Sequence, residues 1–215
     1  NKGRKENVWL VDRAIILQES AYCAKTARAA EPSDERDLVS FAMQIIKKRM
    51  LSSRFALRNT VANRLLALKA KEEADAPPSR SELREWQSDL PIGELMQERI
   101  EGRLLRTGVS RDAKRRNAEK KQLQTIGKLL DKAEDSPDPK IRRLVEDLEA
   151  SVLPEPGEKA IIFTEYRDTL QALKTALTAH PAFAGGFTEL TGGLSSSQRQ
   201  ARIARFHEPD CRLLL

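Results

Sequence analysis

The chain has 215 residues, 40% hydrophobic but only 5% aromatic, with two cysteines and two histidines, which excludes collagen, mucin-like stalks and disulfide miniproteins. This length fits one or two domains whose cores are aliphatic. Lysine and arginine total 38 against 32 acidic residues, and the net charge of +6 permits a polyanionic partner without requiring one.

Two regions with different periodicity follow one another along the chain. Up to about Leu153 the pattern is helical, whereas from Glu158 onward apolar strands alternate with helices. The loop Pro154–Gly157 carries two prolines and a glycine, which end a helix. We therefore predict a mostly α N-terminal helical region at 1–153, followed by an α/β region at 154–215.

The helical region predicts six helices. The first is expected at 34–50, with acids in its first turn, and the second begins after a cap at Ser52 or Ser53 and runs antiparallel to the first. A break at 76–78 ends the second helix, and Ser79 or Ser81 caps the third. The remaining helices are expected at 90–106, at 118–132 and, after a break at 135–139, around 141–148. Further upstream, Ile15 to Leu17, Tyr22 and Cys23 are assigned to a core. Trp9 and Trp86 either pack on helix faces or stack on bases.

Positive charge is concentrated in two blocks. The stretch Met43–Lys71 contains no acid and eight cations: Lys47, Lys48, Arg49, Arg54, Arg58, Arg64, Lys69 and Lys71. It is either a solvated face balanced by the acidic stretch 72–101 or a nucleic-acid contact, for which Lys47, Lys48 and Arg49 are the candidates. The second block, 103–128, is either a mobile, solvated connector or a ligand surface.

The last part of the chain predicts three parallel strands. The run 159–164 is expected to be buried on both faces, with further strands at 187–190 and 211–215. Leu170, Leu173 and Leu177 mark a helix between the first two strands. A second helix, 195–206, is expected to turn Ile203 and Phe206 inward. The alternation predicts the beginning of a parallel α/β sheet.

Three segments of this region resemble the second RecA-like lobe of superfamily 2 helicases. The segment 160–167, AIIFTEYR, resembles motif IV, 191–199, TGGLSSSQR, resembles the next element, and 211–215, CRLLL, resembles the strand leading to motif V. The similarity is greatest to Swi/Snf-type translocases and their RapA-like relatives. The run 46–57 is similar to the stretch before this lobe in RapA-like proteins and in helicases of DISARM-type phage defence.

The resemblance implies a fragment of an ATP-dependent DNA translocase or helicase. The sequence has no phosphate loop and no Asp-Glu-x-His box, and it ends before the expected motifs V and VI. The resemblance implies ATP and Mg²⁺ for the parent protein. Because these motifs are missing, no cofactor or metal is expected in this chain, and the chain alone is not expected to hydrolyse ATP. The implied partners are double-stranded DNA and the missing first motor lobe.

Ligands of parallel α/β sheets bind at the carboxyl ends of the strands. With the resemblance, this favours phosphate contacts by Thr164, Thr191 and Gly192, with charge from Arg167 and Arg199. The structural alternative is that Ser195 caps a helix, the glycines make a turn and Arg199 pairs with an acid.

A second alternative for the whole chain is a non-catalytic helical module that binds DNA or protein. Glu165 and Asp168 are interpreted as helix-dipole partners rather than an acid/base pair.

The remaining signals concern metals and membranes. Cys23, Cys211, His180 and His207 do not form a pair with metal-ligand spacing, so neither zinc nor a structural disulfide is expected. No apolar run approaches the roughly 18 residues that span a bilayer, and no signal-peptide core follows the polar first residues. A cytoplasmic protein without membrane contact is therefore expected.

Overall fold

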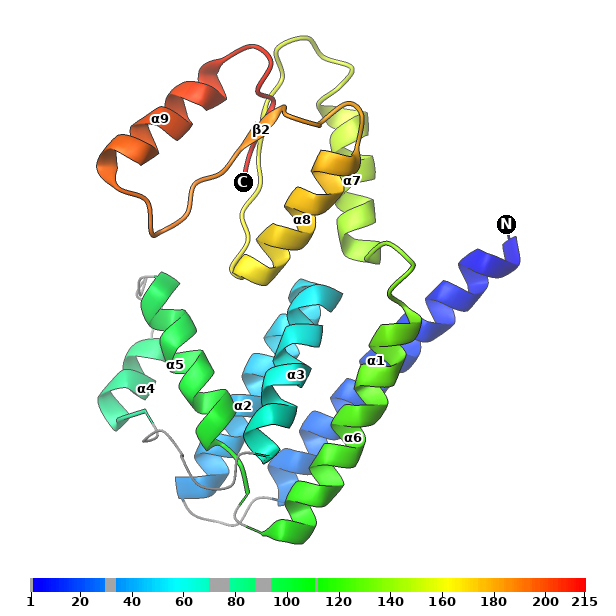
Figure 1. Cartoon of the computed structure of the whole chain (residues 1–215), viewed down its shortest axis with the longest axis vertical. Helices are drawn as coiled ribbons and strands as arrows, with labels where there is room; N and C mark the ends of the chain where they lie inside the picture. Colours follow the sequence, from blue (N-terminus) through cyan, green and yellow to red (C-terminus); the bar gives the residue numbers. More distant parts are fainter. Residues whose placement is uncertain (1, 30–33, 70–77, 88–93, 111) are drawn as a thin grey trace. The chain divides into compact units, whose positions relative to one another are not determined.

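The computed structural model describes residues 2–29, 34–69, 78–87, 94–110 and 112–215. They form two compact units, Asn1–Ser136 and Pro137–Leu215. We call these the helical unit and the α/β unit and describe each by itself (Figure 1).

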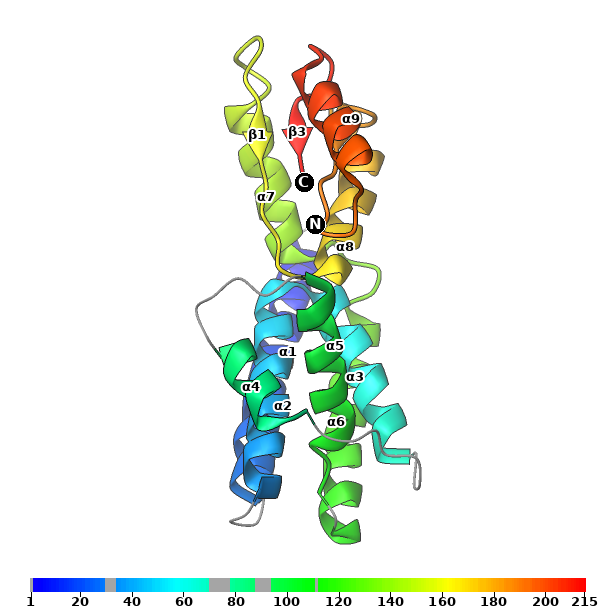
Figure 2. The same cartoon turned by 90° about the vertical axis from the view of Figure 1, so that its left-hand side faces the viewer.

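The described part of the helical unit is a bundle of helices. These are α1 (Lys2–Ala29), α2 (Asp34–Ser52), α3 (Arg54–Lys69), α4 (Arg80–Gln87), α5 (Glu94–Thr107) and α6 (Ala113–Lys132). α1 packs on α2 and α6, α3 packs on α2, α5 and α6, and α4 lies against α5 (Figure 2). A single residue, Ser53, separates α2 from α3, which run antiparallel as predicted (Figure 1).

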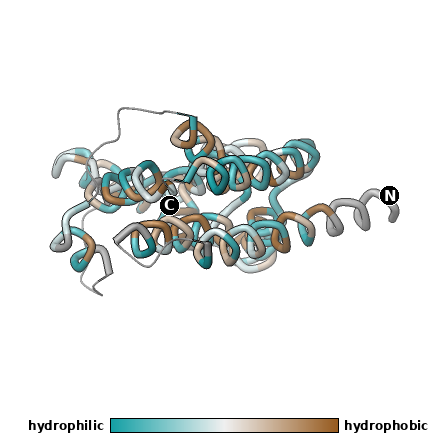
Figure 3. The backbone as a smooth tube through the Cα atoms, turned by 90° about the horizontal axis from the view of Figure 1, so that it is seen from below, coloured by the Kyte–Doolittle hydropathy of each residue, from teal (hydrophilic) through white to brown (hydrophobic). Residues whose placement is uncertain are grey.

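Hydrophobic side chains on the inner faces of these helices form the bundle core. Tubes coloured by hydropathy show apolar and polar residues alternating around the helices (Figure 3), as expected for amphipathic helices. Tyr22, Cys23 and Ile15 are buried, as the sequence predicts. The prediction for Ile16 and Leu17 is wrong, since these side chains are 51% and 60% exposed. Consecutive helical residues point in different directions, so only one of the three can face the core.

Three of the predicted serine caps are present. The Ser53 hydroxyl accepts a hydrogen bond from the Ala56 amide at 3.1 Å. Ser79 and Glu82 form reciprocal bonds at the start of α4, between the Ser79 amide and the Glu82 carboxylate and between the Glu82 amide and the Ser79 hydroxyl. At α9, Ser195 and Gln198 form a second capping box. The break around Ala76 and Pro77 lies outside the described residues.

The α/β unit contains a small parallel sheet with the strand order β1-β3-β2. Its elements are α7 (Pro139–Ser151), β1 (Ala160–Ile161), α8 (Arg167–Ala179), β2 (Phe187–Thr188), α9 (Ser196–His207) and β3 (Leu213–Leu214). Ala160 and Phe187 both pair with Leu213, on opposite sides of the central strand. The predicted order of strands and helices is confirmed, although each strand is shorter than predicted.

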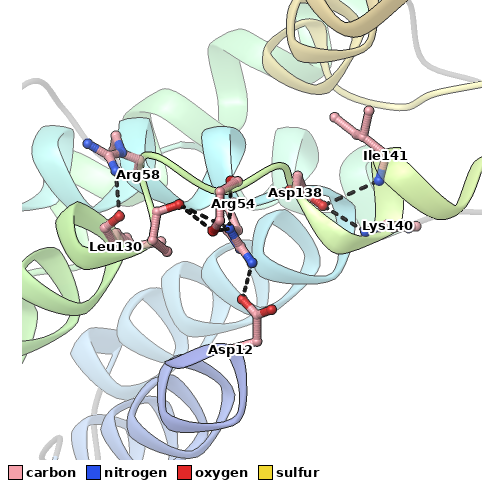
Figure 4. Close-up of polar contacts among 9 residues, drawn as sticks. Asp12, Arg54, Arg58, Leu130, Asp138, Lys140 and Ile141 are labelled. Atoms are coloured by element: carbon pink, nitrogen blue, oxygen red, sulfur yellow. Dashed lines mark hydrogen bonds and ion pairs between the residues drawn. The ribbon is translucent and has the colours of Figure 1, made fainter. Parts of the chain in front are cut away.

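The unit boundary lies earlier than the sequence-based boundary at residue 153. α7 packs on α8, and Ile141, Leu148 and Val152 belong to the same core cluster as Leu173 and Leu213. The first break, at 135–139, therefore separates the two units, and the prolines at 154–156 lie in a loop inside the α/β unit. Asp138 caps α7 by accepting the amides of Lys140 and Ile141 (Figure 4).

The second face of the sheet differs from the prediction. Residues alternate between the two faces of a strand, so Ala160 and Ile162 face the α7–α8 side, whereas Ile161 and Phe163 are 52% and 91% exposed. The expectation that this strand is buried on both faces is therefore wrong. α9 contacts β2 but buries none of its own side chains, and Ile203 is 40% exposed rather than inward; Phe206 is half-buried.

Candidate nucleic-acid interface

The carboxyl ends of the three strands form one edge of the sheet. Hydrogen bonding continues past the strands, from the Ile162 amide to the Leu214 carbonyl at 2.8 Å and from the Leu190 amide to the Leu215 carbonyl at 2.8 Å. Because the strands are parallel, the segments that follow β1 and β2 leave the sheet at this same edge. Thr164 and Thr191 are in these two segments, and both are half-buried.

Arg167 lies beside the loop that follows β2. A Cβ atom built on Gly193 would lie 3.8 Å from Nη2 of Arg167, so the guanidinium group is next to the 191–193 loop. Arg167 begins α8, directly after the segment that contains Thr164. The structure therefore brings Arg167 and the loop containing Thr191 and Gly192 together, although they are more than twenty residues apart in sequence. Arg167 and Gly192 are both exposed.

The start of α9 is occupied by its own cap. The Ser195 hydroxyl accepts from the Gln198 amide at 3.3 Å, and the Gln198 side chain accepts from the Ser195 amide at 2.9 Å. The amides of Ser195 and Gln198 are thus already hydrogen-bonded, which confirms the interpretation of Ser195 as an N-cap. Arg199, in the first turn, is exposed and forms no ion pair within the α/β unit, contrary to the alternative that pairs it with an acid.

Several other cations of the α/β unit stabilise its loops. Lys159 Nζ donates to the carbonyls of Phe206, Glu208 and Cys211. Arg205 forms an ion pair with Asp210, and this pairing raises the pKa of Arg205 and lowers that of Asp210. The Arg212 guanidinium donates to three carbonyls of the loop before β1, those of Val152, Glu155 and Glu158. These side chains hold the sheet and α9 in place rather than facing outward.

In the helical unit, arginines of the Met43–Lys71 block form ion pairs with other helices. Arg49 contacts the buried Glu101 of α5 at 3.2 Å. Arg54 contacts Asp12 of α1 at 2.5 Å and donates to the carbonyls of Ala133 and Ser136 (Figure 4). The block itself contains no acid, so the acids that pair with its arginines come from neighbouring helices.

Arg58 extends the same pattern to the end of α6. Its guanidinium contacts Asp131 at 3.2 Å and Glu134 at 3.3 Å. It also donates to the Leu130 carbonyl (Figure 4). All of these partners are on or just after α6. Because both acids are exposed, the ion pairs contribute little alone, whereas the bond to the helix-terminal carbonyl fixes the side chain.

Arg64 is the centre of a buried polar network. It is fully buried, and its Nε donates to Glu119 Oε1 at 2.8 Å, which also accepts from the Tyr22 hydroxyl at 2.8 Å. Its two terminal nitrogens donate to the carbonyls of Leu105 and Gly108 at the end of α5. Burial alone would lower the pKa of Arg64, but its interactions with Tyr22 and Glu119 outweigh burial and raise that pKa. Arg64 therefore has a structural role.

The lysines of the block are on the surface. Lys47, Lys48 and Lys69 are exposed, whereas Arg49 is half-buried against Glu101. Of the three residues predicted to bind nucleic acid here, the two lysines are thus exposed and the arginine is not. Lys71 and the side chains of Trp9 and Trp86 lie outside the described residues.

The described residues contain no cluster of three or more His, Cys, Asp or Glu side chains that could hold a metal. Both cysteines are buried and free, and burial raises the pKa of each thiol. Across the described ranges, no helix has the length and apolar character needed to cross a membrane.

Comparison with protein families identifies the α/β unit. The helicase conserved C-terminal domain matches residues 139–215, about a third of the chain, beginning at the first residue of α7. With the small parallel sheet, this supports a C-terminal lobe of a superfamily 2 helicase, a class of domain associated with nucleic-acid binding. No curated protein and no solved structure matches the chain. Residues 139–215 are thus similar to part of a helicase or translocase.

Proposed function

We propose that this chain is part of an ATP-dependent DNA translocase or helicase of the Swi/Snf type, whose α/β unit grips the phosphate backbone of double-stranded DNA. The observation that supports this most is the position of Arg167 beside the 191–193 loop. This pair lies next to the sheet edge where Thr164 also leaves its strand. A helicase C-terminal match over the same residues supports the assignment.

The side chains at this edge suit phosphate oxygens. The hydroxyls of Thr164 and Thr191 can donate hydrogen bonds, and the guanidinium of Arg167 can donate two parallel bonds to one phosphate. Gly192 and Gly193 have no side chain, so a strand can approach their backbone closely. Arg199 adds charge one helical turn into α9. Contacts of this kind fix the register of a strand but do not read bases.

ATP and Mg²⁺ belong to the proposal for the whole motor. The sequence has no glycine-rich phosphate loop, and the described residues supply no metal cluster. The residues of this chain therefore do not fit the nucleotide and its metal by themselves, and we assign nucleotide chemistry to a first motor lobe as partner. The proposed role of this chain is to hold DNA, in the cytoplasm, while that lobe acts.

The test is DNA affinity as a function of salt. Replacing Arg167 with alanine, and Thr164 and Thr191 together with alanine, is expected to weaken binding of a labelled duplex. Loss of the charged contact of Arg167 should make the slope of log K against log salt less steep by about 0.9. The threonine hydroxyls carry no charge, so their loss should lower the affinity and leave the slope unchanged. Arg142→Ala is the matched control, since this exposed arginine of α7 pairs only along its own helix with Glu146. Unchanged affinity in the Arg167 and threonine variants would overturn the proposal.

A non-catalytic helical interaction module is the second candidate, and the interhelical ion pairs favour it. The structure uses Arg49, Arg54, Arg58 and Arg64 to hold the bundle together. Charge reversal of Lys47 and Lys48 separates the two candidates without touching these pairs. Loss of DNA binding with unchanged helicity would support the motor, whereas failure of the unmodified chain to bind a duplex would favour the module.

A further inference from the structure

Three lysines of α6 lie along one side of the helix. Lys114, Lys121 and Lys128 follow one another at intervals of seven residues, which is close to two helical turns, so they point in nearly the same direction. All three are exposed. Neighbouring lysines are roughly 10.5 Å apart along the axis, and the stripe spans roughly 21 Å.

The acids of α6 are directed elsewhere. Glu119 is buried against Arg64, Asp131 contacts Arg58, and the N-cap Asp112 accepts the amides of Lys114 and Arg115. None of the three lysines forms an ion pair with a residue in the described ranges, and no acid lies three or four residues before any of them on the helix. Glu119 is thus buried, whereas the exposed Asp112 and Asp131 have partners other than the side chains of the three lysines, so the stripe keeps its positive charge.

We infer that this lysine stripe is a second surface for the phosphate backbone of a nucleic acid. The inference rests on the proposed function for the identity of the partner. Double-stranded DNA carries one charge per roughly 1.7 Å of axis when both strands are counted, so a stripe of roughly 21 Å lies along a length of duplex that carries about a dozen phosphates, some of them on the side that the stripe contacts. Lysine binds phosphate as a point charge and needs no fixed geometry, which suits an exposed helix face.

The chemistry between the lysines argues against an acidic protein as the partner. The exposed residues on this side include Asn117, Gln124 and Thr125, which are polar and of modest size. Protein interfaces are depleted in lysine and have apolar or aromatic residues at their centre. A surface with separated lysines and polar side chains matches interfaces with nucleic acid, which are polar and positively charged.

The experiment compares two sets of variants of the full chain on one labelled duplex. The triple variant Lys114→Gln, Lys121→Gln, Lys128→Gln is expected to bind more weakly, with a salt slope less steep by about 2.7, because three contacts are lost. The single variant Lys121→Gln is measured as well, and Lys69→Gln is its matched control, since each removes one exposed lysine from a helix of the same unit. Lys121→Gln should make the slope less steep by about 0.9, whereas Lys69→Gln should leave it unchanged. Circular dichroism verifies that helicity is unchanged.

The outcomes separate this inference from the proposed function. Weakened binding in the α6 variant supports the stripe even if the Arg167 variant binds normally, in which case only the proposed sheet-edge site fails. Normal DNA binding and an unchanged slope in the α6 variant overturn the stripe, whatever the Arg167 variant does. Loss of binding to polyglutamate with DNA binding intact also overturns it, because the partner would then be an acidic protein.

Discussion

Arg64 shows why arginine rather than lysine occupies the buried positions of the bundle. Its planar group makes three directed hydrogen bonds, one to Glu119 and two to carbonyls at the end of α5. A lysine ammonium group at the same place has no fixed fork to match these acceptors. One side chain thus connects α3 with both α5 and α6, and through Tyr22 the network reaches α1.

Replacing Arg64 with methionine is expected to destabilise the helical unit by about 3–5 kcal/mol, because it leaves Glu119 buried without its partner. Denaturant unfolding followed by circular dichroism measures the loss. Adding Glu119→Gln removes the stranded charge while leaving an acceptor for Tyr22. The double variant should therefore lose less free energy of unfolding than the two single variants lose together. Losses that add exactly would contradict a coupled network.

Glu19 gives the bundle a stability that depends on pH. Its side chain is buried, and desolvation raises its pKa above the ordinary value of 4.5, although the Cys23 thiol donates to it at 2.9 Å and Lys47 lowers the pKa. Because the folded state holds this proton more tightly, stability falls as the pH rises from 4.5 through the folded pKa.

Glu19→Gln is expected to abolish this part of the pH dependence. Relative to the unmodified chain, the variant should gain stability between pH 4.5 and pH 7. Thermal unfolding measured across this range provides the comparison. Parallel curves for the two proteins would show that the pKa of Glu19 is the same in the folded and unfolded states, which would contradict a raised folded pKa.

Gly108 marks a close approach between elements. A Cβ at this position would lie 2.6 Å from the Leu38 carbonyl oxygen and 2.9 Å from that of Leu104, both backbone atoms that cannot move alone. Gly108→Ala should therefore force α5 and α2 apart and destabilise the unit by about 1–3 kcal/mol. Gly127→Ala is the control, since nothing lies within 4 Å of its Cβ position, and it should be neutral or stabilising.

At the scale of elements, helices were more predictable than strands. The caps at Ser53, Ser79 and Ser195 can be predicted from the sequence because an N-cap depends only on residues within one helical turn. Whether Ile161 or Ile203 is covered depends instead on which helix packs over it, which local periodicity does not contain. In the same way, the acids that meet Arg49 and Arg54 come from α5 and α1, so the charge block appeared more open in sequence than it is.

The candidate site was predictable in part for a topological reason. Parallel strands bring the segments after β1 and β2 to one edge, which is why Thr164 and Thr191 could be named from the sequence. The position of Arg167 beside Gly193 required the structure. The sequence shows that α6 is rich in lysine. The structure adds that the acids Glu119 and Asp131 pair with Arg64 and Arg58 and not with the lysines.

At the scale of the whole molecule, the unit boundary predicts which fragments fold. Residues 137–215 include α7, whose Ile141 and Leu148 complete the core of the α/β unit, so this fragment should give dispersed amide signals in an NMR spectrum. Residues 154–215 lack these side chains and should be largely unfolded. Residues 1–136 should fold separately with the helicity of a bundle. If fragments 137–215 and 154–215 gave equally dispersed amide signals, the boundary would lie at the Pro154 loop instead.

The division of labour between arginine and lysine has a consequence for chemical modification. The interhelical ion pairs described above use arginine, whereas the exposed stripe of α6 is made of lysine. Acetylation neutralises lysine and leaves arginine untouched. An acetylating enzyme or reagent could therefore remove the positive charge of the exposed lysines one at a time, while the interhelical ion pairs of arginine stay intact. The affinity for a polyanion would then fall stepwise without unfolding of the bundle.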